Sequence, residues 1–229
     1  MAANDIAQRI SSETNTVHKY LVTLEELRLV SKHIPFAAEP NTRSGRWRLD
    51  DDFLRFWFRF VFAFQSDLES GLEPTTLFDT EIAPVMAEHV ASSFEQWCVH
   101  WLRSNAASGA TKFGTWWGPA ANEFRSTKQR TSEEIDAVGS QRNQVITVAE
   151  AKWTNKQLGP AIVDDIERYK IPALRQQLEV AERPHIYLFA KSGYTPALHS
   201  LADAADHITL VDVAAALGTT HESGSRRRN

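Results

Sequence analysis

The second half of the chain alternates apolar and polar residues in short runs, which is the pattern of β-strands. The clearest run is QVITVAEAKW, residues 144–153. Because side chains alternate across a strand, Glu150 and Lys152 share one face with the apolar Ile146 and Val148. The turn-forming residues GSQRN precede this run, and EIDAV lies before the turn. The pattern therefore predicts an antiparallel hairpin in which one face changes from apolar to charged at the open end.

The elements expected around this hairpin follow a defined order. We expect helices at residues 82–103, 161–180 and 196–204. We expect strands at residues 112–118, 133–140, 144–153, 185–194 and 207–213. The order α-β-β-β-α-β-α-β predicts an α/β (α+β) fold in which helices flank a mixed sheet.

The first fifty residues have a helical period instead. A short helix over 5–11 and the polar break SSETN precede a second helix, whose apolar positions recur at helical spacing: Val17, Tyr20, Leu21, Leu24 and Leu27. Strands at 29–30 and 47–49 enclose a turn-rich loop. This pattern predicts a winged helix-turn-helix over residues 1–50, beginning at what would be its second helix.

An aromatic helix is expected between these two parts. FLRFWFRFVFAF, residues 53–64, is apolar around most of its circumference, and only Arg55 and Arg59 leave a polar stripe. Three aspartates precede the run, and we expect one of them to cap the helix. With the turn-rich SGLEPTT this helix forms a joint over 51–76. We then expect the sheet domain over 77–216 and a disordered basic tail over 217–229.

Composition excludes several classes of protein. A single cysteine, Cys98, leaves no internal disulfide framework or Cys-rich zinc site and favours a reducing, cytoplasmic setting. The N-terminus lacks the apolar core of a signal peptide, and the longest apolar run is shorter than a membrane span, so no membrane partner is expected. A formal net charge of −4 argues against non-specific coating of nucleic acid, so any DNA contact must be local.

The open end of the hairpin carries the candidate chemistry. Antiparallel pairing brings Asp136 near Glu150, and two carboxylates with water suit Mg²⁺ or Mn²⁺, which prefer oxygen ligands. Lys152 beside them could orient or help deprotonate an attacking water and stabilise charge that develops on a phosphate. We therefore expect Asp136 and Glu150 as metal ligands and all three residues as a catalytic group.

The spacing of these residues resembles that of the PD-(D/E)xK nuclease superfamily. In that superfamily an Asp on the second strand is followed by Glu-x-Lys on the third, which matches Asp136 and Glu150-Ala151-Lys152. Many members carry a further acidic residue on the helix before the sheet, and this resemblance implies a catalytic role for Glu95. The resemblance also implies a restriction-endonuclease-like sheet as the fold of residues 77–216.

A second resemblance covers nearly the whole chain. The segments YLVTLEELRLV, RWRLDDDFLRFWFRFV, FEQWCVHWL, GTWWG, EIDAV and AEAKW occur in an order similar to that of the DUF234 family, the C-terminal region of archaeal-type prokaryotic P-loop ATPases. That resemblance implies a winged helix followed by a nuclease-like module. A Gly-x-x-x-x-Gly-Lys-Ser/Thr loop does not occur in these 229 residues, so an ATP-driven role is not expected of them alone. A truncated or split gene product that works with a separate P-loop ATPase subunit, and a stand-alone relic, both stay open.

Basic residues near the predicted wing and near the sheet are the candidates for DNA contact. They are Lys19, Arg43, Arg46, Arg48, Arg125, Lys128, Arg130 and Arg142. Residues 1–50 hold seven Lys and Arg against six Asp and Glu, so this part has almost no net positive charge. A winged helix that only docks on a neighbouring domain, and basic side chains that are only solvated, therefore stay open as alternatives.

The sequence thus favours a DNA-binding, Mg²⁺-dependent endonuclease-like protein that hydrolyses phosphodiester bonds. Two alternatives remain open. The nuclease-like sheet could be a catalytically inactive scaffold for DNA binding or regulation of an ATPase. The three charged residues could also form a surface salt-bridge cluster, worth about 0–1 kcal/mol and without activity.

Overall fold

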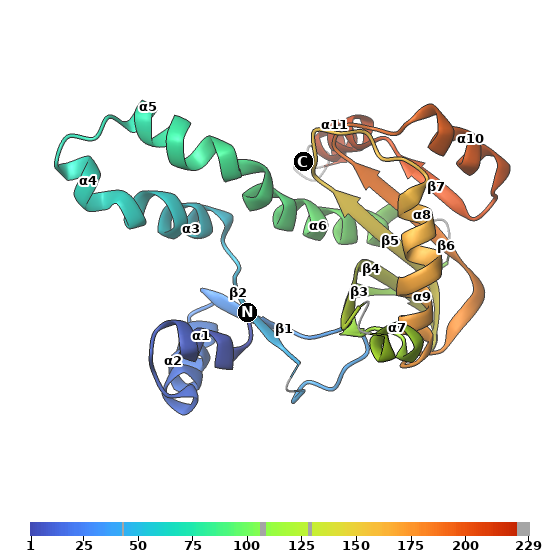
Figure 1. Cartoon of the computed structure of the whole chain (residues 1–229), viewed down its shortest axis with the longest axis horizontal. Coiled ribbons are helices and arrows are strands. Elements are labelled where there is room, and N and C mark those ends of the chain that lie inside the picture. The colour runs from blue at the N-terminus through green and yellow to red at the C-terminus, as the bar shows by residue number, and fades with distance from the viewer. Residues whose placement is uncertain (43, 106–108, 128–129, 224–229) are drawn as a thin grey trace, which may run out of the picture. The chain divides into compact units, whose positions relative to one another are not determined.

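The protein divides into two compact units, Met1–His89 and Val90–Asn229. The structure is a computed structural model, and it describes residues 1–42, 44–105, 109–127 and 130–223. Figure 1 labels the helices and strands of both units. Within the described residues, no helix combines the length and the apolar character that a bilayer crossing requires.

The N-terminal unit begins with two helices and a two-stranded sheet. Helices α1 (Ala3–Arg9) and α2 (Thr14–Glu26) precede the antiparallel strands β1 (Val30–His33) and β2 (Arg46–Leu49). Their shared core is formed by apolar side chains from all four elements: Ala7, Val17, Leu21, Val30 and Trp47. The expected succession of two helices and a hairpin is therefore present, with the helical period of α2 directing Val17 and Leu21 inward.

The aromatic helix forms a helical hairpin with the segment that follows it. It runs through α3 (Asp52–Phe56), a π-helical turn (Trp57–Val61), a 3₁₀ turn (Phe62–Phe64) and α4 (Gln65–Glu69). Asp51 caps it, because its Oδ1 accepts a hydrogen bond of 2.8 Å from the Leu54 amide. This confirms the predicted aspartate cap.

The second arm of that helical hairpin begins at α5 (Pro74–Leu77) and continues through η3 (Phe78–Ile82) and η4 (Ala83–Val85) into α6 (Met86–Asn105). Phe60 of the first arm packs with Leu77 and Ile82 of the second. This shared core joins residues up to His89 to the N-terminal unit. The division of the chain thus falls after His89, whereas we expected the sheet domain to begin at residue 77.

The C-terminal unit is built on a five-stranded mixed sheet (Figure 1). Its strands lie in chain order: β3 (Lys112–Pro119), β4 (Ser132–Gln141), β5 (Gln144–Lys152), β6 (Val180–Ala190) and β7 (Ile208–Val211). The pairs β3·β4 and β4·β5 are antiparallel, and β5·β6 and β6·β7 are parallel. The predicted mixed sheet is confirmed.

Helices cover both faces of this sheet. On one face Phe94, Cys98 and Leu102 of α6 pack against alternate residues of the strands, among them Ala149 and Phe189. The opposite face meets a helical segment made of α8 (Ala161–Asp165), η5 (Ile166–Lys170) and α9 (Ile171–Arg175), whose Lys170 contacts Glu150. Figure 1 shows α8 and α9 over this face.

Proline explains two departures from the expected elements. The helix predicted over 161–180 ends at Arg175 and contains a π-helical turn just before Pro172. Proline has no N–H to donate, and its ring clashes with the carbonyl group four residues earlier, so it disrupts the regular α-helical hydrogen bonds. Strand β6 begins at Val180, before Pro184, whereas the strand was expected to begin at residue 185. The strand tolerates this proline because its register with β5 shifts over residues 180–185.

Two helices in the described part of the C-terminal unit were not predicted. The short α7 (Asn122–Ser126) lies between β3 and β4. Helix α11 (Val213–Ser223) occupies the start of the expected tail, because Val213 and Ala216 join the core beside α6. The disordered tail predicted over 217–229 is therefore wrong as far as Ser223, and residues 224–229 lie outside the described part.

The core beneath α6 makes a stability prediction. Leu102 is 1% exposed, and Leu102→Ala should lower the free energy of unfolding of the C-terminal unit by about 2–5 kcal/mol through lost burial and a cavity. Urea denaturation followed by tryptophan fluorescence measures this. His100→Ala, at an exposed position on the same helix, is the matched control and should change stability by less than about 0.5 kcal/mol. Equal effects of both substitutions would contradict the packing described.

Candidate active site

The candidate site lies where β4 and β5 stop pairing. The last register pair at this end is Ala137 with Ala149, so Asp136 and Glu150 follow next on their strands. The carboxylate of Asp136 then turns to the neighbouring strand, where its Oδ2 accepts a hydrogen bond of 2.9 Å from the Ala151 amide. A side chain thus takes the place of a backbone acceptor, which satisfies a buried N–H and fixes the Asp136 carboxylate.

Lys152 joins the two carboxylates. Its Nζ lies 2.7 Å from Glu150 Oε2 and 3.5 Å from Asp136 Oδ2. Both carboxylates therefore face the same space. The structure brings together Asp136, Glu150 and Lys152, the three residues that the hairpin pattern singled out.

A second ammonium group completes the cluster. Lys170 Nζ, on the π-helical turn η5, donates a hydrogen bond to Glu150 Oε1. Glu150 therefore holds one lysine on each oxygen. Its side chain is 0% exposed, and those of Lys170 and Lys152 are 12% and 34% exposed. Sequence reasoning could not choose Lys170 over the other polar residues of this helix, because Lys170 lies on an irregular, π-helical turn.

Burial and charge shift the ionisation of this cluster. Burial raises the pKa of Glu150 and the nearby Asp136 charge raises it further, while Lys152 and Lys170 oppose the shift. Burial lowers the pKa of Lys152, but the charges of Glu150 and Asp136 outweigh burial, and its pKa lies above the ordinary value. Both raised pKa values favour the protonated form of the residue concerned, so Lys152 stays cationic at neutral pH.

Glu95 lies on α6 and is half-buried. Its charge acts on the buried Cys98 one turn along the helix. Burial raises the pKa of the Cys98 thiol, with further contributions from Asp136 and Glu95. Glu95 and Asp136 are thus both near Cys98. Glu95, however, lies on α6, on one face of the sheet, whereas Glu150 points to the opposite face, which α8–α9 covers.

The basic candidates of the C-terminal unit differ in their contacts. Arg130 lies in an internal cluster: it binds Glu133 at 3.0 Å and Asp165 at 2.5 Å, and its guanidinium lies 4.0 Å from the Tyr169 ring centroid. The exposed Arg125 donates to Asn122.

Arg142 lies in the hairpin turn, six residues from Asp136 along β4, which is about 20 Å at the usual strand rise. Arg142 is therefore not a residue of the candidate site. Lys128 falls outside the described residues.

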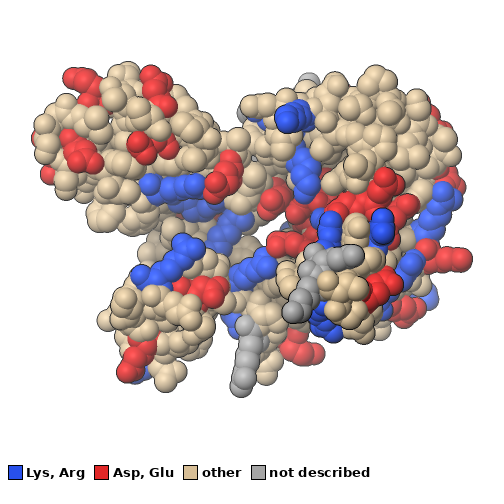
Figure 2. Space-filling model, viewed as in Figure 1, with Lys and Arg blue, Asp and Glu red and all other residues tan. Residues whose placement is uncertain are grey.

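The remaining basic candidates belong to the N-terminal unit. Lys19 is exposed on α2, and Arg46 and Arg48 lie on β2, where Arg48 comes within 3.9 Å of Asp52. Arg43 falls outside the described residues. On the face of the C-terminal unit that Figure 2 shows, Lys and Arg are interspersed with Asp and Glu. The visible surface of this unit thus has no uniform basic area.

The donor set at the site fits a hard cation that keeps part of its water. Among the described residues, no group of three or more His, Cys, Asp and Glu side chains is placed to hold a metal ion. Asp136 and Glu150 offer two carboxylates, and Mg²⁺ is commonly held by one or two carboxylates together with water and substrate phosphate. These two carboxylates could hold Mg²⁺ or Mn²⁺ together with water, and they are too few for a closed structural metal site.

Comparison with known proteins gives one match. Residues 57–164 match the model of the DUF234 family, described as archaea bacterial proteins of unknown function. The matched region includes the aromatic helix from Trp57 onward, α6 and the hairpin with Asp136, Glu150 and Lys152. Neither the curated proteins nor the solved structures contain a match to this chain. By this match, residues 57–164 of the chain belong to the DUF234 family.

Proposed function

We propose that the C-terminal unit is a divalent-metal-dependent endonuclease of the PD-(D/E)xK type that hydrolyses phosphodiester bonds in DNA. The observation that carries this proposal is the convergence of Asp136 and Glu150 on a single ammonium group, that of Lys152. Two carboxylates and a lysine at the open end of a hairpin supply the residue types that metal-assisted phosphodiester hydrolysis needs.

Each of the three residues has a separate role in this proposal. Asp136 and Glu150 would hold the metal ion, and the Ala151 amide keeps the Asp136 carboxylate in place. Mg²⁺ or Mn²⁺, when bound, neutralises phosphate charge and makes water a better nucleophile. Lys152, cationic at neutral pH, would donate a hydrogen bond to a phosphate oxygen and stabilise the charge that develops there.

The remaining parts of the chain fit this proposal as positioning elements. The two helices and hairpin of the N-terminal unit would form a winged helix that binds duplex DNA through Lys19, Arg46 and Arg48. A P-loop ATPase partner would supply the motor, since no Gly-x-x-x-x-Gly-Lys-Ser/Thr loop occurs in these 229 residues. A cytoplasmic setting agrees with a DNA substrate and with the free, buried Cys98.

A second candidate function rests on the two lysines of Glu150. Both carboxylate oxygens already bind an ammonium group, and the four side chains Asp136, Glu150, Lys152 and Lys170 together carry no net charge. Such a cluster is complete without a metal. In this alternative the unit is an inactive scaffold for DNA or protein contacts, and the cluster fixes the hairpin to α8–α9.

Cleavage of plasmid DNA tests the first proposal. The purified chain with Mg²⁺ or Mn²⁺ should nick or linearise plasmid, and EDTA should abolish cleavage. Asp136→Asn should reduce the rate at least about 100-fold, since even outer partners of metal ligands are worth roughly 10–100-fold. Glu123→Gln, the same acid-to-amide change at an exposed position on α7, is the control. Cleavage that survives Asp136→Asn would contradict the assigned role.

Metal binding can be measured without activity through Lys170→Met. Removing one cation from the buried Glu150 should lower stability by about 3 kcal/mol in the absence of metal. Mn²⁺ should then raise the melting temperature of this variant more than that of the parent, because the ion replaces the lost charge. Arg168→Met, an exposed cation on the same turn, is the control. If Mn²⁺ stabilises neither protein, the scaffold function is favoured.

A further inference from the structure

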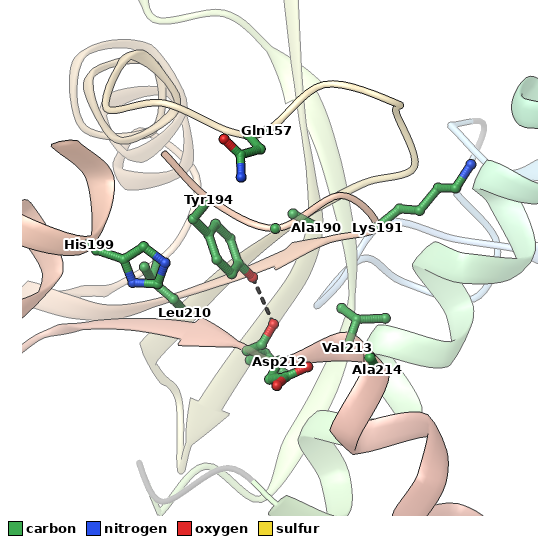
Figure 3. A pocket seen from close by; sticks show the side chains of 11 residues that line it. Gln157, Ala190, Lys191, Tyr194, His199, Leu210, Asp212, Val213 and Ala214 are labelled. Carbon is green, nitrogen blue, oxygen red and sulfur yellow. Dashed lines mark hydrogen bonds between the residues drawn. The ribbon is translucent and has the colours of Figure 1, made fainter. Parts of the chain in front are cut away.

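A pocket of about 400 Å³ opens beside the candidate site, at the ends of β6 and β7 (Figure 3). Its walls come from four segments: the loop after β5, the turn after β6, helix α10 (Pro196–Ala204) and the start of α11. Apolar side chains form part of the lining, among them Ala190, Leu210 and Val213. The volume suits a small organic group, and ligands of sheets with parallel strands bind at this carboxyl edge.

The pocket lies next to the carboxylate and lysine cluster. Lys152, the last residue of β5, is the register partner of Ala190, which ends β6 and lines the pocket. On the other side of β6, Phe189 is paired with Val211 at the end of β7. Neighbouring strands are about 4.8 Å apart, so the pocket begins roughly 5–10 Å from β5. A strand of DNA with a phosphate at Asp136 and Glu150 could reach the pocket with a nearby nucleotide.

Rings and hydrogen-bonding groups converge on this pocket. Figure 3 shows Gln157 and Asp212 on opposite sides of Tyr194, with the His199 ring beside it. The Tyr194 ring is fixed, because its hydroxyl donates a hydrogen bond of 2.8 Å to the Val211 carbonyl. The His199 and Tyr194 rings meet edge to face at 5.8 Å. Gln157, His199 and Asp212 are exposed and can reach a ligand.

The charges favour a base over a phosphate. Asp212 places a carboxylate at the pocket, and a phosphate would be repelled by it. The nearest lysine is turned away: Lys191 Nζ binds Asn155 at 2.8 Å, lies 5.2 Å from the Trp153 ring centroid and points away from the other lining residues (Figure 3). A planar, uncharged heterocycle with amino groups can stack on the rings and donate to Asp212.

We propose that this pocket binds a nucleobase of the DNA strand close to the cleaved phosphodiester, and prefers bases that carry an amino group. This inference rests on the proposed function and adds a feature of its substrate. A base inside a pocket is neither paired nor stacked in a duplex, so the strand must be single or unpaired at that nucleotide. Adenine, cytosine and guanine can donate from an exocyclic amino group to Asp212, whereas thymine has only its N3–H, which lies between two carbonyl oxygens that a carboxylate repels.

Binding of mononucleotides tests the pocket directly. Saturation-transfer NMR with dAMP, dCMP, dGMP and TMP should show stronger transfer to base protons than to sugar protons. The dissociation constants of the three amino-bearing nucleotides should be about fivefold lower than that of TMP, which corresponds to one net hydrogen bond. His199→Ala should weaken all four through loss of a ring contact.

Asp212→Asn is the matched variant. The Asp212 side chain also caps α11, because Oδ1 accepts a hydrogen bond of 3.1 Å from the Ala215 amide, and asparagine caps a helix equally well. The variant keeps this bond but replaces the other carboxylate oxygen by a donor. The variant should therefore lose the preference for amino-bearing nucleotides over TMP, and its melting temperature should equal that of the parent.

Two outcomes separate this inference from the proposed function. Base binding by Asp136→Asn with the affinity of the parent supports the pocket, even where plasmid cleavage is absent. Metal-dependent cleavage by the parent without mononucleotide binding, and with no effect of Asp212→Asn or His199→Ala, overturns the pocket and leaves the nuclease proposal standing. Equal affinity for TMP and the other three nucleotides overturns the assigned role of Asp212.

Discussion

The buried carboxylate of Glu150 is the constraint on which the C-terminal unit depends. A carboxylate with no exposure is costly unless it is paired, and it meets Lys152 on one oxygen and Lys170 on the other. The first lysine comes from its own strand and the second from the helical segment over the sheet. The ion pairs therefore determine how α8–α9 sits on β5. They also explain why the π-helical turn matters, since it directs Lys170 to the sheet.

The same cluster sets a condition on metal binding. Asp136, Glu150, Lys152 and Lys170 balance one another in charge, so a divalent ion between the carboxylates would leave an excess of two positive charges. In the proposed nuclease, a phosphodiester placed next to the ion removes part of this excess, and an ammonium group that leaves Glu150 can bind a phosphate oxygen. Metal and DNA should then bind cooperatively, because each compensates charge that the other introduces.

The sequence was informative about features that depend on residues close together in the chain. Period-two alternation placed Glu150 and Lys152 on one face, and the short turn before them brought Asp136 across from them. It could not find Lys170, whose direction depends on an irregular helical turn. Nor could it find the pocket, since Gln157, Tyr194, His199 and Asp212 come from segments that meet only in the folded sheet. The start of β6 before Pro184 was also not predicted, because the register shift that accommodates this proline depends on the neighbouring strand.

In the proposed function, the internal pairing of basic residues limits how this unit could bind DNA. Arg130 binds Glu133 and Asp165 and lies over Tyr169, so its charge is already compensated. Arg142 lies at the far end of the hairpin. With few basic side chains at the site, affinity cannot come mainly from release of counterions by many phosphate contacts. In the proposed function it comes instead from a metal ion at Asp136 and Glu150, a single phosphate held by Lys152, and a base in the neighbouring pocket. An enzyme built in this way would find its cleavage site by the local shape and pairing of the strand, and its binding would depend only weakly on salt.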